Sequence, residues 1–195
     1  MTYRPKLLLN ALTFLALLCT GPVAAAPAAT PPDVAGTGHL LLDMGSNQVL
    51  AAQNIDHKLE PASLTKILTA YVVFREIRNG HISLNDPVLV SEKAWRMEGS
   101  RMFIEVGKQV SVEDLLKGLI VASGNDSAVA LAEHTAGSEE AFANLMNEHA
   151  ERLGMTNSHF VNASGLPHPE HYTTPADIAR ATIATIREFP EWYAW

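Results

Sequence analysis

Apolar residues recur at helical spacing along residues 62–79, directly after a proline. The apolar positions are Leu64, Ile67, Leu68, Tyr71, Val72 and Ile77. This spacing is that of one buried face of a helix. Proline is favoured at the start of a helix because it loses no intrahelical hydrogen bond there, and glycine often follows a helix end. With Pro61 before this stretch and Gly80 after it, we predict a helix from about Ala62 to Asn79.

Further apolar runs on either side of this helix predict the other elements. Short runs bounded by turn residues predict strands, and periodic runs that follow a capping residue predict helices. The predicted strands are residues 39–43, 48–52, 86–90 and 102–106, and the first two form a hairpin. The predicted helices are residues 111–121, 126–135, 138–153 and 174–188. The order of these elements predicts an α+β fold that is largely helical from Ser111 to Glu188.

The strands of the predicted hairpin are apolar on both faces. Residues 39–43 read His-Leu-Leu-Leu-Asp and residues 48–52 read Gln-Val-Leu-Ala-Ala. Such strands are typical of a sheet that helices cover on both sides. A hairpin of two strands is barely stable alone, so we expect it to have partner strands.

The first 26 residues have the pattern of an export signal. Arg4 and Lys6 precede an almost wholly apolar run over residues 7–18, and small residues follow at 23–26. A membrane anchor is the alternative, but the run is shorter than the roughly 20 residues that span a bilayer. We therefore predict a cleaved signal peptide over residues 1–26, a flexible leader over 27–38, one partial domain over 39–195 and a periplasmic location.

Composition narrows the possible functions. The net charge is −7 without a basic cluster, which argues against a nucleic-acid partner. The single cysteine, Cys19, lies in the predicted signal, so we expect no disulfide, thiolate metal site or cysteine nucleophile in the mature chain. The tightest histidine pair, His168 and His171, lies in a proline-containing loop without a third ligand nearby. No metal is therefore expected.

Ser63 and Lys66 are candidates for an activated serine and its base. They are three residues apart at the start of the predicted helix, a spacing that places two side chains on one face. A serine nucleophile needs a neighbouring base, and a lysine serves as one when burial and a helix N-terminus lower its pKa. The N–H groups there can also stabilise an oxyanion. However, a Ser-x-x-Lys match arises by chance about once in a chain of this length.

A second candidate motif, Ser123-Gly124-Asn125, lies at the break between two predicted helices. The hydroxyl of Ser123 could relay a proton to a leaving amine, and the amide of Asn125 could bind both the lysine and a substrate carbonyl. The alternative is an ordinary turn in which Asn125 or Asp126 caps the next helix. Asp177 is a weaker catalytic candidate, because its place three residues after Thr174 is typical of a helix start.

The two motifs together resemble those of β-lactamases and penicillin-binding proteins. The chain is similar to the low-molecular-mass penicillin-binding proteins, which are serine-type D-alanyl-D-alanine carboxypeptidases of peptidase family S11. The similar stretches are residues 61–66, 118–126, 153–155, 159–162 and 171–174. The resemblance implies a β-lactamase/DD-peptidase-like transpeptidase fold, with a helical subdomain and an antiparallel sheet flanked by helices.

The resemblance also implies a role for each motif residue. Ser63 attacks the carbonyl between the two terminal D-alanines of a peptidoglycan stem peptide, and water later hydrolyses the acyl-enzyme. Lys66 is the general base, Ser123 passes a proton to the leaving amine, and Asn125 orients Lys66 and the substrate. β-Lactam antibiotics are implied to acylate Ser63 as covalent inhibitors. No metal or organic cofactor is implied.

The third motif of that family, Lys-Thr-Gly, does not occur in the sequence. The lysines after Lys66 are Lys93, Lys108 and Lys117, and none precedes Thr-Gly. In the family this motif grips the terminal carboxylate of the substrate, and its strand contributes to the oxyanion hole. We therefore expect the domain to be truncated before the C-terminal strands and the helix that associates such enzymes with the inner membrane. Poor folding and little activity are expected to follow.

Two other functions stay open. A β-lactamase would share the fold, but class A enzymes favour Asp where this chain has Gly124 and need a glutamate for deacylation. Fast turnover of nitrocefin would favour that function. A non-catalytic remnant that binds the cell wall would fit the absence of Lys-Thr-Gly, and it would bind peptidoglycan without forming an acyl-enzyme.

Overall fold

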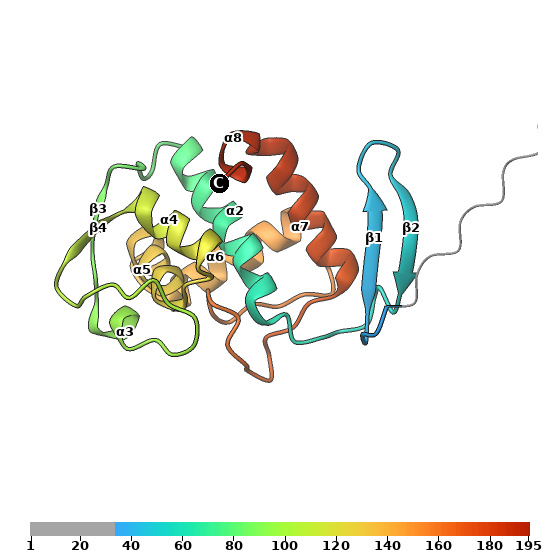
Figure 1. The fold of residues 1–195 in the computed structure, drawn as a ribbon, viewed down its shortest axis with the longest axis horizontal. Helices are drawn as coiled ribbons and strands as arrows, with labels where there is room; N and C mark the ends of the chain where they lie inside the picture. The colour runs from blue at the N-terminus through green and yellow to red at the C-terminus, as the bar shows by residue number, and fades with distance from the viewer. Residues whose placement is uncertain (1–33) are drawn as a thin grey trace, which may run out of the picture. The chain divides into compact units, whose positions relative to one another are not determined.

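The computed structural model describes residues 34–195. The predicted signal peptide and most of the predicted leader lie outside these residues. The elements are β1 (His39–Asp43), β2 (Gln48–Gln53), η2 (Ala62–Leu64), α2 (Thr65–Arg78), β3 (Pro87–Leu89), α3 (Glu92–Trp95), β4 (Gln109–Ser111), α4 (Val112–Val121), α5 (Asn125–Ala136), α6 (Glu139–Arg152), α7 (Pro175–Glu188) and α8 (Pro190–Tyr193) (Figure 1). Among the helices of this part of the chain, none is long and apolar enough to cross a membrane.

Helix α2 is the centre of the fold. It contacts α4, α5, α6 and α7, and these helices lie around it in Figure 1. Its side chains Leu68, Val72 and Phe74 are buried in one core with Leu119 and Leu131 from α4 and α5. Each large apolar side chain contributes roughly 1.5–3 kcal/mol when it is fully buried. The helix predicted to carry the nucleophile is therefore held by packing on several sides.

The predicted helices are confirmed, with their ends close to the expected residues. Ser111, Ser138 and Thr174 each accept a backbone N–H three residues ahead, at the starts of α4, α6 and α7. The start of α2 differs slightly, because Ala62–Leu64 forms a 3-10 turn before the α-helix begins at Thr65. The short helices α3 and α8 were not predicted.

The prediction of a strand over residues 102–106 is wrong. The side chain of Asp126 accepts the backbone N–H groups of Met102, Phe103 and Ile104 at 3.0, 2.8 and 3.3 Å. Phe103 has a φ of 66°, which no strand residue adopts. A carboxylate from α5 thus takes the place of a strand partner, and β3 pairs antiparallel with β4 at Gln109–Ser111 instead.

The hairpin of β1 and β2 is confirmed, but its expected cover is only partly present. The strands pair antiparallel with an irregularity between Leu41 and Leu42. Leu41 and Val49 are 54% and 51% exposed, so within residues 34–195 helices do not cover both faces. The sheets of these residues have two strands each, and the expected partner strands are therefore absent from this part of the chain.

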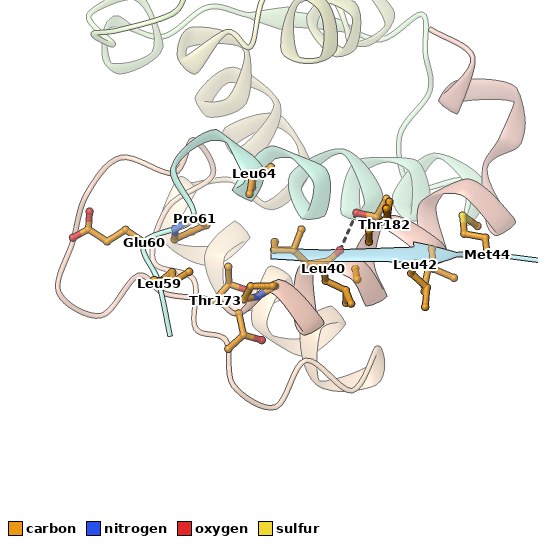
Figure 2. Close-up of a pocket in the computed structure, with 15 residues that line it drawn as sticks. Leu40, Leu42, Met44, Leu59, Glu60, Pro61, Leu64, Thr173 and Thr182 are labelled. Carbon is orange, nitrogen blue, oxygen red and sulfur yellow. Dashed lines mark hydrogen bonds between the residues drawn. The ribbon is translucent and has the colours of Figure 1, made fainter. Parts of the chain in front are cut away.

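An apolar cavity of about 390 Å³ lies where the hairpin meets the helices. Figure 2 shows Leu40 and Leu42 of β1 on one side of it, with Leu64 of η2 and Thr182 of α7 on the others. The lining of this cavity does not include Ser63, Lys66, Ser123 or Asn125. Thr182 lines both this cavity and the one that contains Ser63, Lys66 and Ser123, so the two cavities adjoin at α7.

Candidate active site

The turn of η2 and the first turn of α2 place Ser63 and Lys66 side by side. The Nζ of Lys66 lies 3.2 Å from the Oγ of Ser63. Ser63 is exposed, whereas Lys66 is only 6% exposed. Residue Ala62 has a φ of 46°, so the chain turns sharply just before the serine. The predicted pair is therefore brought together, with the hydroxyl open to solvent and the amine behind it.

The amine of Lys66 has two further partners besides the serine. It donates to the Oδ1 of Asn125 at 2.7 Å and to the backbone carbonyl of Ser164 at 2.8 Å. A neutral amine has two N–H donors and one lone pair, so it can satisfy these two acceptors and still accept the proton of a hydroxyl. The three partners of Lys66 are therefore compatible with the form of lysine that acts as a base.

Burial favours that neutral form. It lowers the pKa of Lys66 from 10.5 to about 8, because a charged ammonium loses hydration when it is enclosed. At neutral pH about a tenth of the molecules would then carry an uncharged amine, far more than for an ordinary lysine. Near physiological pH a fraction of the Lys66 amines is thus uncharged and able to accept a proton.

The carboxamide of Asn125 is oriented by its other contacts. Its Nδ2 donates to the carbonyl of Glu98 at 2.6 Å, and its backbone N–H donates to the carbonyl of Ser100 at 2.7 Å. With Nδ2 engaged in this way, Oδ1 points to Lys66. The alternative in which Asn125 or Asp126 caps this helix is wrong, because Gly124 is the N-cap of α5 and no side chain caps the helix there. Asn125 is instead the first residue of α5, and its side chain contacts the lysine.

Ser123 lies in the same cavity as Ser63 and Lys66. This cavity has a volume of about 420 Å³, and Leu119, Ile120, Trp192 and Tyr193 form much of its apolar wall. Ser123 has a φ of 52°, and it is half-buried. Within residues 34–195 its hydroxyl makes no hydrogen bond, so it is available to a group that enters the cavity.

His171, considered above as a metal ligand, supports the active-site helix instead. Its Nδ1 accepts the N–H of Val161 at 3.2 Å, which leaves the proton on Nε2 to be donated to the Oγ1 of Thr65 at 2.8 Å. Burial lowers the pKa of His171 to about 4, so the ring is neutral. Residues 34–195 contain no group of three side chains placed to hold a metal ion.

Two contacts at the site could not be found from residue types. Ser164 reaches Lys66 through its backbone carbonyl, which any residue could supply. Gly165 has a φ of 88°, and a Cβ there would lie 1.8 Å from the carbonyl oxygen of Ala62. The one signal in the sequence was that glycine itself.

Asp177 has the predicted helix-start role, and it also accepts from the Ser158 hydroxyl at 2.7 Å.

The chain matches known proteins along almost its whole length. Residues 25–195 match the family model of D-alanyl-D-alanine carboxypeptidase, peptidase S11. The chain is 44% identical over 187 residues to D-alanyl-D-alanine carboxypeptidase DacC of Escherichia coli. The aligned region covers 93% of this chain and 47% of that protein. The chain is 40% identical over 167 residues to DacA of Haemophilus influenzae, covering 84% of this chain and 42% of the relative.

Solved structures give the same result. The carboxypeptidase DacD from Francisella tularensis superposes with a TM-score of 0.83 and 38% identity, over 91% of this chain and 43% of that one. Penicillin binding protein 5 from Haemophilus influenzae superposes with a TM-score of 0.81 and 40% identity, over 85% of this chain and 49% of that one. These neighbours have the transpeptidase fold expected above, which is thereby confirmed. The chain spans about half the length of the relatives it matches.

Proposed function

Because the chain belongs to the D-alanyl-D-alanine carboxypeptidase family, we propose that it supplies the acylation half of such a site. Ser63 is the nucleophile, Lys66 its base, Ser123 the proton shuttle and Asn125 the residue that orients both the base and the substrate. The substrate is a peptidoglycan stem peptide that ends in two D-alanines, and the chain is exported to reach it. β-Lactam antibiotics acylate the same serine.

The environment of Lys66 is the observation that carries this proposal. Its amine lies 3.2 Å from the Ser63 hydroxyl, and the acceptors Asn125 Oδ1 and Ser164 O hold its two N–H groups. Burial lowers its pKa to about 8. A lysine that only paired with solvent or with a carboxylate would be charged and could not take a proton.

The reaction follows from these positions. As the Oγ of Ser63 bonds to the carbonyl carbon between the D-alanines, its proton passes to the Nζ of Lys66. The backbone N–H of Ser63, at the start of the helix, faces the developing oxyanion. The C–N bond then breaks, and the Ser123 hydroxyl gives its proton to the leaving amine while it regains one from Lys66. Water hydrolyses the resulting ester and frees Ser63.

The rate of residues 1–195 by themselves is proposed to be low. Residues 1–195 contain no Lys-Thr-Gly triplet. The family resemblance implies that this triplet binds the terminal carboxylate of the substrate and that its strand contributes to the oxyanion hole. Loss of one oxyanion donor typically costs about 10²–10³ in rate. Ser63 can therefore be acylated even when the turnover of residues 1–195 is slow.

The proposal is tested by D-alanine release from a stem pentapeptide. The purified chain should release D-alanine slowly, and the Ser63→Ala variant should release none above the background of buffer. Nitrocefin added in parallel should be turned over no faster than the pentapeptide. Rapid nitrocefin turnover would instead identify a β-lactamase, and peptidoglycan binding without D-alanine release or any Ser63 adduct would identify a non-catalytic binding protein.

A further inference from the structure

A loop formed by residues 162–166 contacts Lys66 and the turn that precedes Ser63. The carbonyl of Ser164 accepts from the Nζ of Lys66 at 2.8 Å. The backbone of Gly165 lies so close to Ala62 that a Cβ at position 165 would be 1.8 Å from the Ala62 oxygen. Ser164 is 2% exposed. The loop therefore covers the lysine on one side and presses on the turn that carries Ser63.

One side chain, that of Asn162, ties this loop together. Its Oδ1 accepts the N–H of Gly165 at 2.7 Å and the N–H of Ser164 at 3.2 Å. The hydroxyl of Ser164 lies 3.4 Å from the same oxygen. The Nδ2 of Asn162 donates to the carbonyl of Leu166 at 3.0 Å. An asparagine that binds its own backbone two and three residues ahead fixes a tight turn, so the position of the Ser164 carbonyl depends on Asn162.

The neighbouring residue Ala163 is anchored independently. Its N–H donates to the Oε1 of Glu139 at 3.1 Å, and its carbonyl accepts from the Oγ1 of Thr69 at 2.7 Å. These contacts to α6 and α2 do not involve Asn162. Removal of the Asn162 side chain should therefore release the stretch from Ser164 to Leu166 while the start of the loop stays attached.

We propose that Asn162 is a positioning residue of the acylation site. By shaping the loop it places the Ser164 carbonyl on the amine of Lys66 and the Gly165 backbone against the turn before Ser63. It touches neither the substrate nor the reacting atoms. The effect on acylation rests on the function proposed above, whereas the effect on Lys66 can be measured without any activity.

The test compares three variants of the chain. Asn162→Ala removes the side-chain oxygen, and Asn162→Ser keeps a hydroxyl that accepts the same N–H groups more weakly. Asn147→Ala is the matched control, because Asn147 binds the backbone of Phe160 in both directions, at 2.7 and 2.9 Å, without contact to Lys66. Thermal unfolding shows whether each variant folds and how much stability it loses.

The first measurement is the pH midpoint at which the Lys66 amine reacts with acetic anhydride, followed by peptide mass spectrometry. In Asn162→Ala, water should reach the amine and replace the carbonyl, which reduces the desolvation that lowers the pKa. We expect the midpoint to rise by about one pH unit, with Asn162→Ser between that value and the wild type. Asn147→Ala should keep the wild-type midpoint.

The second measurement is the rate at which labelled penicillin acylates Ser63, which should fall about tenfold or more in Asn162→Ala. The proposal is overturned if Asn162→Ala keeps the wild-type midpoint, or if Asn147→Ala shifts it equally. If Asn162→Ala does not fold, Asn162→Ser decides by the same readings. If the wild type is not acylated at all, the proposed function fails, and the midpoints still decide the role of Asn162.

Discussion

The Nζ of Lys66 lies 2.7 Å from the Oδ1 of Asn125, although the two residues are 59 positions apart in the sequence. This contact joins the first turn of α2 to the start of α5. It gives the lysine a neutral acceptor rather than a carboxylate, and a carboxylate would favour the charged amine. The identity of this one acceptor thus bears directly on whether Lys66 can act as a base.

The rate of Ser63 acylation should depend on pH through Lys66. Since only the neutral amine accepts a proton and its pKa is about 8, the rate should rise about tenfold per pH unit below that value and level off above it. Labelled penicillin and quenched mass spectrometry between pH 5.5 and 9.5 would measure this. The Lys66→Met variant should lose the pH dependence and about 10²–10⁴ in rate. A flat wild-type profile would contradict a role for Lys66 as the base.

Alanine substitutions at two glycines should distinguish the effect of backbone strain from the effect of displacing the Asn125 side chain. Gly99 and Gly80 have φ values of 81° and 77°, and a Cβ at Gly99 would lie 2.9 Å from the Nδ2 of Asn125, whereas Gly80 has nothing within 4 Å. Both variants should lose about 1–2 kcal/mol of stability from the left-handed backbone. Only Gly99→Ala should also slow acylation, by about tenfold to a hundredfold.

Urea unfolding and acylation assays on the two glycine variants would check this. Equal acylation rates at matched stability would mean that the position of the Asn125 side chain is not critical. A loss of stability in Gly99→Ala alone would mean that the contact with Asn125, rather than the backbone conformation, sets the cost.

His171 should make the protein less stable in acid. Burial lowers its pKa from 6.5 to about 4, so between these values the unfolded chain binds a proton that the folded chain does not. Stability should therefore fall as the pH drops from 6.5 towards 4. Urea unfolding at several pH values should show that the free energy of unfolding declines less steeply in His171→Gln. Part of the decline that remains should come from His149, because burial also lowers its pKa. Identical slopes in the two proteins would contradict this assignment.

Much of the fold follows from local patterns. The spacing of apolar residues and the capping residues Ser111, Ser138 and Thr174 predicted the main helices, because these signals act within a few residues of the chain. The prediction of a strand at residues 102–106 was wrong because the structure of this segment depends on a distant residue. The N–H groups of the segment pair with Asp126, a side chain more than twenty residues away, and no periodicity reveals such a partner.

The site was predictable to the extent that it depends on side-chain chemistry. Ser63, Lys66, Ser123 and Asn125 are residue types that suit an acyl transfer, and the structure places Ser63, Lys66 and Ser123 around one cavity with Asn125 on the lysine. The carbonyl of Ser164 was not predictable. A backbone group carries no signature of residue type, and its position depends on a turn whose contacts appear only in three dimensions.

The central claim is that Ser63 is a nucleophile activated by Lys66, and covalent labelling tests it most directly. The chain would be compared with a fusion in which the remaining part of Escherichia coli DacC follows Trp195. Both proteins would be incubated with labelled penicillin, and the adduct would be located by peptide mapping. The variants Ser63→Ala and Lys66→Met serve as controls in each protein.

We predict a single adduct on Ser63 in the fusion. The adduct should be lost in Ser63→Ala and should form much more slowly in Lys66→Met. In residues 1–195 alone the same adduct should form about 10²–10³ times more slowly, because Lys-Thr-Gly does not occur in them and the loss of one oxyanion donor typically has an effect of this size. Equal rates in the two proteins would contradict the low activity expected for residues 1–195. An adduct on another residue, or no adduct on Ser63 in a folded fusion, would contradict the assignment of Ser63 as the nucleophile.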